Sequence, residues 1–445
     1  MIPSHVPASP PGEGNVIRGD RKRASVLGLL TWVFGEDASI LGDRSLQVLL
    51  LVNLSPPLGA SLVSPLLESL TGPFGVSEAE VALMLTAFTA PSIVLIPIAG
   101  LLADRYGRKV VMVVGLLLFS LGGLAITLTT DFRVVLALRL VQGVGFAGLT
   151  PVIVTSLGDL YRGSAEATAQ GIRFATTGLV LMTLPLVGGA LLALAWQYPF
   201  YLYGIGLPAA AVVALFFEEP SDAAEDAETE GGSVRDVLSV VRQPRVAAVL
   251  VGRAVPNFLY IAFLTTNSFV VVNLLDGTPS LAGLLVTAAS VMHVIAATQA
   301  GRVTAWFDSR LYPLLVATLS MGLGLAVVGL APTYLAAVGG SAAIGLGFGL
   351  SLSLYRSVIT GFTSDALRGS VVSVGSSLGR VGATVAPIVT GVTIAAVEPS
   401  LGSEVATRAV VVGCGVASAG VGTLTLVVAR LAGPVVLPGE QAKTA

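Results

Sequence analysis

The feature that most constrains this sequence is a succession of long apolar runs between residues 46 and 430. Hydropathy divides this part of the chain into about twelve runs, most of them near the roughly 20 residues that an α-helix needs to cross a bilayer. The predicted spans are 46–67, 79–102, 110–129, 134–157, 167–194, 199–217, 246–272, 281–304, 311–331, 335–358, 371–395 and 405–430. The predicted fold class is therefore all-α integral membrane, with 12 transmembrane helices.

The composition also favours a membrane protein. Of the 445 residues, 54% are hydrophobic and 11% are charged, whereas soluble domains have about 25% charged residues. A net charge of -2 gives no electrostatic basis for binding nucleic acid. The single cysteine, Cys414, excludes an intrachain disulfide and a thiolate metal cluster. The sequence predicts a monomer embedded in the lipid bilayer, with no metal site and no cofactor.

Lysine and arginine fall mostly on one side of the predicted spans. Of these 24 residues, 17 lie in the termini and alternate loops, two lie in the other loops and five lie within spans. Because positive loops face the cytoplasm, we expect a multi-pass plasma membrane protein with both termini cytoplasmic. The predicted parts are a cytoplasmic tail with a short surface helix (1–45), a six-helix bundle (46–217), a cytoplasmic linker (218–245), a second six-helix bundle (246–433) and a cytoplasmic tail (434–445).

Two short surface helices are expected outside the spans. Ser25 to Phe34 is too short to cross a bilayer and follows a basic tail, so we expect it to lie on the membrane surface. The linker begins with an acidic stretch, which is typical of a solvated segment. It continues with SVRDVLSVVRQPR, in which the apolar residues have helical spacing.

Short motifs recur at corresponding places in the two halves. GDLYRGS at residues 158–164 is echoed by SDALRGS at 364–370, and GVGFAG at Gly143 is echoed by GLGFGL at Gly345. Each motif occupies the same place relative to the predicted spans of its half. Two related halves suit a transporter, because one half can rock against the other around a central pathway.

The loop between the second and third spans, Gly100 to Met112, has the sequence GLLADRYGRKVVM. Its two glycines permit a tight turn and close approach. Its basic residues indicate a cytoplasmic surface. The residues that we assign to conformational change here are Gly100, Asp104, Arg105, Gly107, Arg108 and Lys109.

This loop, written G-x-L-a-D-R-x-G-R-K, resembles the signature loop between the second and third helices of the major facilitator superfamily of secondary transporters. The resemblance implies that Asp104 holds the inner ends of the two halves together. Its expected partner is the N-terminus of the eleventh helix near Gly369 and Ser370, where helix amides favour an anion. Arg105 and Arg108 are expected to support it by pairing charges or by binding lipid headgroups.

Two further stretches resemble motifs of that superfamily. LALRLVQGVGFA in the fourth span is similar to the pattern R-x-x-q-G-x-g-x-a, and this similarity implies a coupling or substrate role for Arg139 with Gln142. PLVGG at Pro185 in the fifth span matches only the end of the exporter pattern G-P-x-x-G-G. The second match therefore supports export only partially.

Five arginines and one histidine lie within the predicted spans. Arg139 and Arg380 are the deepest, while Arg173, Arg253 and Arg356 lie nearer to the cytoplasmic ends, where their side chains can extend to water. Buried cations without buried anions indicate either an anionic substrate or pairing with carbonyls and loop carboxylates. An unperturbed histidine titrates near neutral pH, so His293 in the eighth span is either a proton-coupling residue or a hydrogen-bonded structural residue.

The resemblance also implies that the first, fourth, seventh and tenth helices line the pathway. Polar side chains at membrane depth need interior partners, which agrees with that placement. The predicted cavity residues are Asn53, Asn257, Tyr260, Asn267 and Tyr355.

The function predicted from the sequence is secondary active transport of a small organic solute by alternating access. Export is the leading direction, with proton antiport as one option for the driving force. One alternative is uptake or facilitated transport of an organic anion, and another is a transporter-like sensor that binds without moving its ligand. No constellation of nucleophile, acid and base is present, so there are no candidate catalytic residues and no enzyme activity is predicted.

Overall fold

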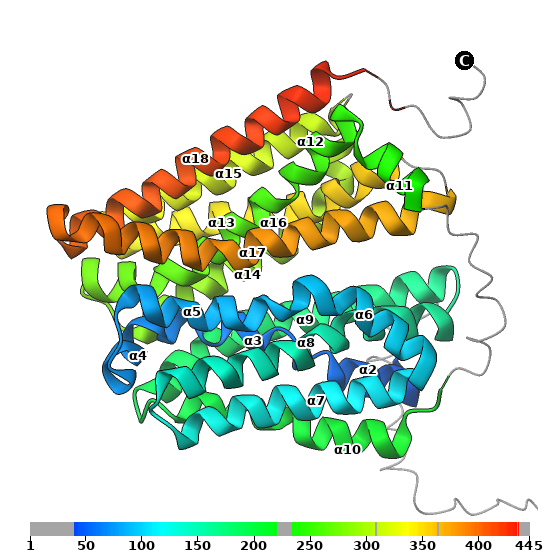
Figure 1. The fold of residues 1–445 in the computed structure, drawn as a ribbon, viewed down its shortest axis with the longest axis horizontal. Coiled ribbons are helices and arrows are strands. Elements are labelled where there is room, and N and C mark those ends of the chain that lie inside the picture. Colours follow the sequence, from blue (N-terminus) through cyan, green and yellow to red (C-terminus); the bar gives the residue numbers. More distant parts are fainter. Residues whose placement is uncertain (1–39, 220–233, 308, 363–364, 434, 436–445) are drawn as a thin grey trace, which may run out of the picture.

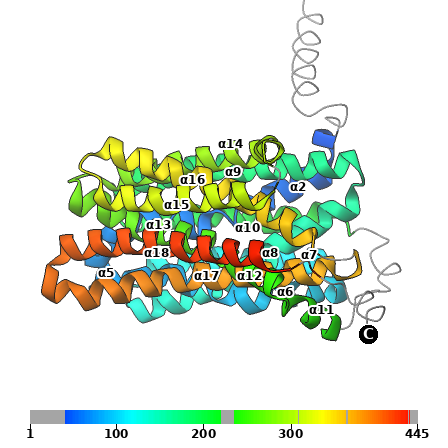
Figure 2. The same ribbon diagram turned by 90° about the horizontal axis from the view of Figure 1, so that it is seen from above.

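The computed structural model describes residues 40–219, 234–307, 309–362, 365–433 and 435. Within these ranges the chain forms helices and turns, with no β-strand. Figure 1 shows the helices in two layers, with α2 to α10 below and α12 to α18 above. Figure 2, turned by 90°, shows that the long helices of both layers run in the same general direction. The predicted all-α membrane fold is confirmed.

The lower layer contains the described helices of residues 44–216. They are α2 (Arg44–Val52), α3 (Leu58–Ser61), η2 (Ser64–Leu66), α4 (Leu67–Phe74), α5 (Glu78–Thr89), α6 (Pro91–Tyr106), α7 (Arg108–Ala125), η3 (Ile126–Leu128), α8 (Phe132–Leu160), α9 (Ser164–Leu192), η4 (Tyr198–Ile205) and α10 (Gly206–Phe216).

The upper layer contains the helices of residues 244–431. They are α12 (Pro244–Gly252), α13 (Ala254–Phe269), the π-helical turn η5 (Val270–Leu274), α14 (Pro279–Ala305), α15 (Leu311–Leu330), α16 (Tyr334–Thr360), α17 (Asp365–Leu401) and α18 (Ser403–Leu431). The short helix α11 (Val234–Val241) precedes them and confirms the surface helix predicted in the linker. The predicted helix at Ser25 to Phe34 and most of the acidic linker lie outside the described residues.

Eleven segments of the described chain are long and apolar enough to cross a membrane, and they correspond to the second to twelfth predicted spans. The first span differs. The sequence predicts a first span over 46–67 that contains Pro56 and Pro57. The structure divides this span among α2, α3, η2 and α4 and extends it to Phe74. The first span is therefore longer than predicted and is broken near the two prolines.

Two adjacent prolines explain the break in the first span. Pro56 and Pro57 lack backbone N–H groups, and their rings clash with the preceding turn of a helix. The helix accordingly stops at Val52, and the chain continues through tight turns in which Leu58 N–H bonds to the Ser55 carbonyl. The broken segment leaves carbonyl groups at membrane depth that need partners from other helices.

Large apolar side chains cover much of the outside of the bundle. Leu101 is 69% exposed, Val392 is 62% exposed and Leu431 is 81% exposed. A soluble protein rarely exposes such side chains over large contiguous areas, whereas a lipid-facing surface requires them.

The repeated glycines pack in the same way in both layers. A Cβ atom on Gly143 of α8 would collide with the backbone oxygen of Phe88 in α5, and one on Gly345 of α16 would collide with that of Ala289 in α14. Both glycines lie where two helices touch through their backbones, and they occupy the same position in the GVGFAG and GLGFGL motifs. The sequence repeat thus corresponds to a repeat of helix packing.

The hydrogen bonds between the two layers gather at one end of the bundle. We call the end that carries Gly107 the motif end and the end that carries Gly75 the far end. The bonds in the described chain join Ser64 to Leu264 and Asn267, Glu68 to Ser268, Glu78 to Asn273, Thr86 to Thr384 and Met182 to Thr287. All of them lie towards the far end, so polar contacts tie the layers together there.

Candidate functional site

A cavity of about 320 Å³ lies between the two layers. Its lower wall includes Pro56, Pro57 and Ser61 beside the break in the first span, together with Phe88 of α5 and Phe146 of α8. Its upper wall includes Arg253, Asn257 and Tyr260 at the start of α13, together with Ser376 and Arg380 of α17. A cavity of this size, formed by both halves of a helical membrane protein, is suited to a small organic molecule.

The structure places some of the predicted cavity residues on the cavity wall and the others elsewhere. Asn257 and Tyr260 line the cavity wall. Asn53 is buried away from it, and its amide donates to the carbonyl of Arg173 and to Thr177 Oγ1. Asn267 belongs to the far-end contact with Ser64. Tyr355 is fully buried in α16, close to the Arg253 guanidinium.

Arg139 is completely buried, and its guanidinium is held by other protein groups. It donates to Gly59 O at 2.6 Å, to Met84 O at 3.1 Å, to Gln142 Oε1 at 2.6 Å and to the Tyr203 hydroxyl at 3.2 Å. Its guanidinium carbon also lies 4.7 Å from the centre of the Phe88 ring. Arg139 and Gln142 therefore lie behind the cavity wall, with Arg139 bonded to the broken first span.

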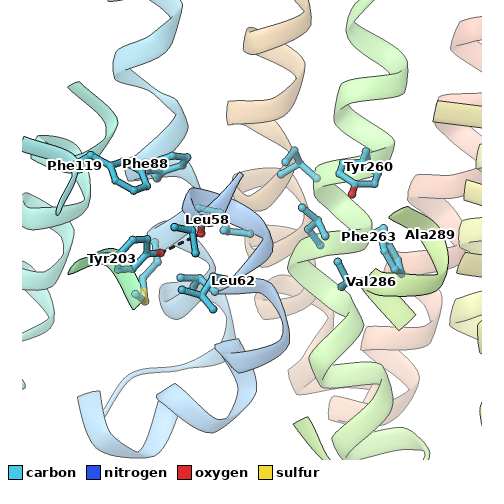
Figure 3. Close-up of a cluster of buried hydrophobic side chains, with 14 of the residues drawn as sticks. Leu58, Leu62, Phe88, Phe119, Tyr203, Tyr260, Phe263, Val286 and Ala289 are labelled. Atoms are coloured by element: carbon cyan, nitrogen blue, oxygen red, sulfur yellow. Dashed lines mark hydrogen bonds between the residues drawn. The ribbon is translucent and has the colours of Figure 1, made fainter. Parts of the chain in front are cut away.

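Tyr203 of η4 supports the same broken segment. Its hydroxyl donates to Leu58 O at 3.3 Å, as the dashed line in Figure 3 shows. Figure 3 also shows Leu62, Phe88 and Phe119 packed around this contact. Two carbonyl groups of the broken first span, Leu58 O and Gly59 O, are thus paired with side chains from η4 and α8.

The other span arginines have different surroundings. Arg173 in α9 donates to Gln170 Oε1 and stacks on Phe174. Arg356 is exposed on the last turn but one of α16. Arg253 and Arg380 line the cavity, and Arg380 lies 5.7 Å from the centre of the Phe146 ring.

Arg253 is a cavity residue that was not among the predicted cavity residues. Arg253 is the N-cap residue of α13, and its partly buried side chain lines the cavity wall. A signal was present, because Arg253, Asn257 and Tyr260 are spaced by four and three residues and so share one helix face.

His293 lies in α14 next to an aromatic stack that reaches the cavity. Its ring meets Phe348 edge to face at 5.0 Å, and Phe348 stacks on Tyr260 at 4.2 Å. Within the described part of the chain, His293 Nδ1 has no hydrogen-bond partner. His293 is therefore one aromatic ring removed from a cavity-lining residue.

The loop at the motif end is fixed by two carboxylates. Arg108 forms an ion pair with Asp159, the aspartate of the repeated GDLYRGS motif at the end of α8. Glu219 accepts hydrogen bonds from the backbone N–H groups of Arg108 at 3.2 Å and Lys109 at 2.6 Å. These carboxylates offset the unfavourable placement of two cations at the N-terminus of α7.

Glycine is required at the turn itself. Gly107 has a φ of 90°, and a Cβ atom there would lie 2.7 Å from Glu219 Oε1. Gly100, about two helical turns earlier, lies in α6 with open space around it. Arg105 is exposed and stacks on Tyr106, with 5.5 Å between its guanidinium carbon and the ring centre.

One detail of the expected partner of Asp104 is corrected by the structure. The helix α17 begins at Asp365, so Gly369 and Ser370 lie in its second turn and not at its N-terminus. The backbone N–H groups of a second turn already bond within the helix and cannot bind an anion. Asp104 itself is exposed in the last turn of α6.

We expect Asp104→Asn to impair transport without destabilising the fold. A carboxylate near the C-terminus of a helix is opposed by the helix dipole, so neutralising it costs no stability. We expect Asp104 to act in the state in which the motif ends of the two layers approach each other, by holding these ends together. Solute flux in proteoliposomes and the midpoint of thermal unfolding measure the two effects.

Asp159→Asn is the matched control for this prediction. It removes the partner of the buried Arg108 guanidinium and is expected to cost about 1–3 kcal/mol of stability. Normal flux in Asp104→Asn would contradict a conformational role for this carboxylate.

Comparison with known proteins agrees with this architecture. The curated relatives include the bacillibactin exporter of Bacillus subtilis (strain 168), which is 34% identical over 158 residues, covering 34% of this chain and 39% of the relative. The multidrug transporter protein MdtP of the same organism is 29% identical over 181 residues, covering 39% of this chain and 33% of the relative. The chain thus spans about two-fifths or less of the length of these two relatives.

Solved structures show that the fold of this chain is also similar to that of known transporters. A bacterial homologue of the human lysosomal transporter Spinster, in an inward-facing and occupied conformation, matches with a TM-score of 0.71 at 18% identity, covering 89% of this chain and 97% of that one. The family model described as Major Facilitator Superfamily matches residues 49–387. This chain therefore belongs to the Major Facilitator Superfamily.

Proposed function

We propose that the protein exports a small organic solute across the plasma membrane by alternating access. The observation that carries this proposal is the central cavity, which both layers line and which the far-end hydrogen bonds close on one side. Such an arrangement presents one binding site to one side of the membrane at a time. The relative named as a bacillibactin exporter favours export as the direction.

The proposed orientation places the motif end and both termini in the cytoplasm. The positive loops support this orientation. In that orientation the far-end contacts close the external side, so the solute enters the cavity from the cytoplasm. We propose a monomer as the working unit, because one chain supplies both layers and the whole cavity wall.

Transport by the purified full-length protein in proteoliposomes tests this proposal. A panel of small organic solutes is loaded on one side, and flux is followed with and without an imposed proton gradient. Flux of at least one solute above that in protein-free vesicles is expected. Binding without flux under any gradient would favour the sensor alternative over a transporter.

Proton coupling is proposed to depend on His293. The unpartnered Nδ1 atom and the contact through Phe348 to Tyr260 connect this titratable ring to the cavity wall. His293→Gln is expected to abolish the response of flux to an imposed proton gradient while leaving binding measurable. An unchanged pH dependence in this variant would remove His293 from the coupling mechanism.

A further inference from the structure

We propose, resting on the export function above, that the solute is an amphipathic organic anion. Its negative group binds between Arg253, Arg380 and Asn257 on the upper wall of the cavity. Its apolar body packs on the lower wall against Phe88, Phe146 and Leu181.

The two arginines carry positive charge that the cavity wall does not neutralise. Neither Arg253 nor Arg380 forms an ion pair within the described chain, and the cavity lining holds no aspartate or glutamate. The Arg253 guanidinium lies beside Gly379, the residue that precedes Arg380 in α17. Two like charges on a wall at membrane depth are costly unless a partner of opposite charge joins them.

N–H donors of Asn257 and Arg253 lie close to Gly379 of α17, which has no side chain. A Cβ atom on Gly379 would lie 2.9 Å from Asn257 Nδ2 and 3.2 Å from Arg253 Nη1. Arg380 is the next residue of the same helix. Within the described residues Arg253 Nη1 has no hydrogen-bond partner. This glycine therefore leaves room for N–H donors from α13 beside Arg380, a combination that suits a carboxylate or a similar oxyanion.

Arg139 shows how this protein holds an arginine with a structural role. It bonds to two carbonyl oxygens, an amide oxygen and a hydroxyl, and it has no exposed surface. Arg253 and Arg380 lack such a set of acceptors and face an open volume. Because Arg253 and Arg380 differ from Arg139 in this way, we infer that their guanidinium groups bind a ligand.

The lower wall of the cavity determines which kind of body, apart from the anionic group, the solute can have. Phe88, Phe146 and Leu181 of the lower layer are apolar, and Pro56 and Pro57 add further apolar surface. All the charged residues of the lining belong to the upper layer. A solute with one anionic group and an aromatic or aliphatic body satisfies both walls together.

Ligand triplets that share one skeleton test the charge requirement. The probes are phenylacetate, phenylacetamide and phenethylamine, and the larger set diphenylacetate, diphenylacetamide and diphenylethylamine. Purified full-length protein is heated with each probe, and the unfolding midpoint is followed against probe concentration. The carboxylates are expected to raise the midpoint at concentrations at which the amides and amines do not.

Variants locate the binding groups. Arg253→Gln and Arg380→Gln are each expected to weaken carboxylate binding by about 10- to 100-fold, as loss of a charge-assisted hydrogen bond implies. Gly379→Ala fills the space between the donors and is expected to weaken binding while keeping both charges. Arg302→Gln, on the exposed end of α14, is the control and is expected to bind like the wild type.

Three outcomes would overturn the proposal. These are equal or better binding of the amides or amines, no binding of either carboxylate to the wild type, or unchanged carboxylate binding in both arginine variants and in Gly379→Ala. Flux of neutral or cationic solutes in proteoliposomes would then leave the export function standing without an anion site. Carboxylate binding that needs both arginines, without flux, would keep the anion site and refute transport.

Discussion

Replacing Gly345 by alanine is expected to destabilise the protein by about 1–3 kcal/mol, the usual cost of overpacking a close interface. The added Cβ atom would collide with the backbone oxygen of Ala289, so α16 and α14 would have to move apart. The backbone oxygen of Ala289 cannot move aside as the end of a flexible side chain can. The midpoint of thermal unfolding in detergent measures the loss of stability, and proteoliposome flux measures the loss of function.

Gly339→Ala is the matched control on the same helix. Nothing lies within 4 Å of a Cβ atom at Gly339, and the residue is exposed. Alanine is favoured over glycine in a helix by up to about 1 kcal/mol, so this variant is expected to be neutral or slightly stabilising. Equal behaviour of the two variants would show that close backbone contact at Gly345 does not limit stability.

The sequence predicted the long spans well because lipid imposes a simple requirement on them. A span must be apolar for about 20 residues and must satisfy its backbone bonds internally, so hydropathy alone finds it. The first span does not follow this rule, because its backbone is divided among several short helices. Pro56 and Pro57 were visible, but whether prolines kink a helix or end it depends on partners such as Arg139 and Tyr203, which lie about 80 and 145 positions further along the chain.

The site was less predictable than the fold, for a similar reason. Asn257 and Tyr260 lie on the cavity wall as expected, while Asn53 and Asn267 bond to other helices. Each is a polar residue in a pathway-lining span, and only the rotation of its helix decides which way it faces. Arg253 was not predicted to line the cavity, because hydropathy does not report helix rotation.

The interpretation of Arg139 changes most. The family resemblance implies coupling or substrate binding, whereas its donors in the structure are bonded to Gly59, Met84, Gln142 and Tyr203. Gly59 adjoins Ala60 and Ser61, which line the cavity. Arg139 therefore lies behind the cavity wall and holds the broken first span against α5 and α8.

Arg139→Gln is expected to lower stability by about 2–4 kcal/mol, since it leaves buried carbonyl oxygens without donors. Arg139→Lys is expected to lose nearly as much, because an ammonium cannot reproduce the planar fork that bonds Gly59 O and Met84 O together. Thermal unfolding of the purified variants measures the loss of stability. Solute affinity is expected to fall with it, as the cavity wall around Ser61 loosens.

The stability measurement separates this structural role from a direct role in binding. If Arg139 acted only on the solute, Arg139→Gln would unfold at the wild-type midpoint and lose transport alone. Arg302→Gln removes an exposed arginine that bonds only to Gln299 within the described chain, and it is expected to change neither property. A stable, transport-deficient Arg139→Gln would place the guanidinium in contact with the solute during the cycle, which requires the first span to move away from it.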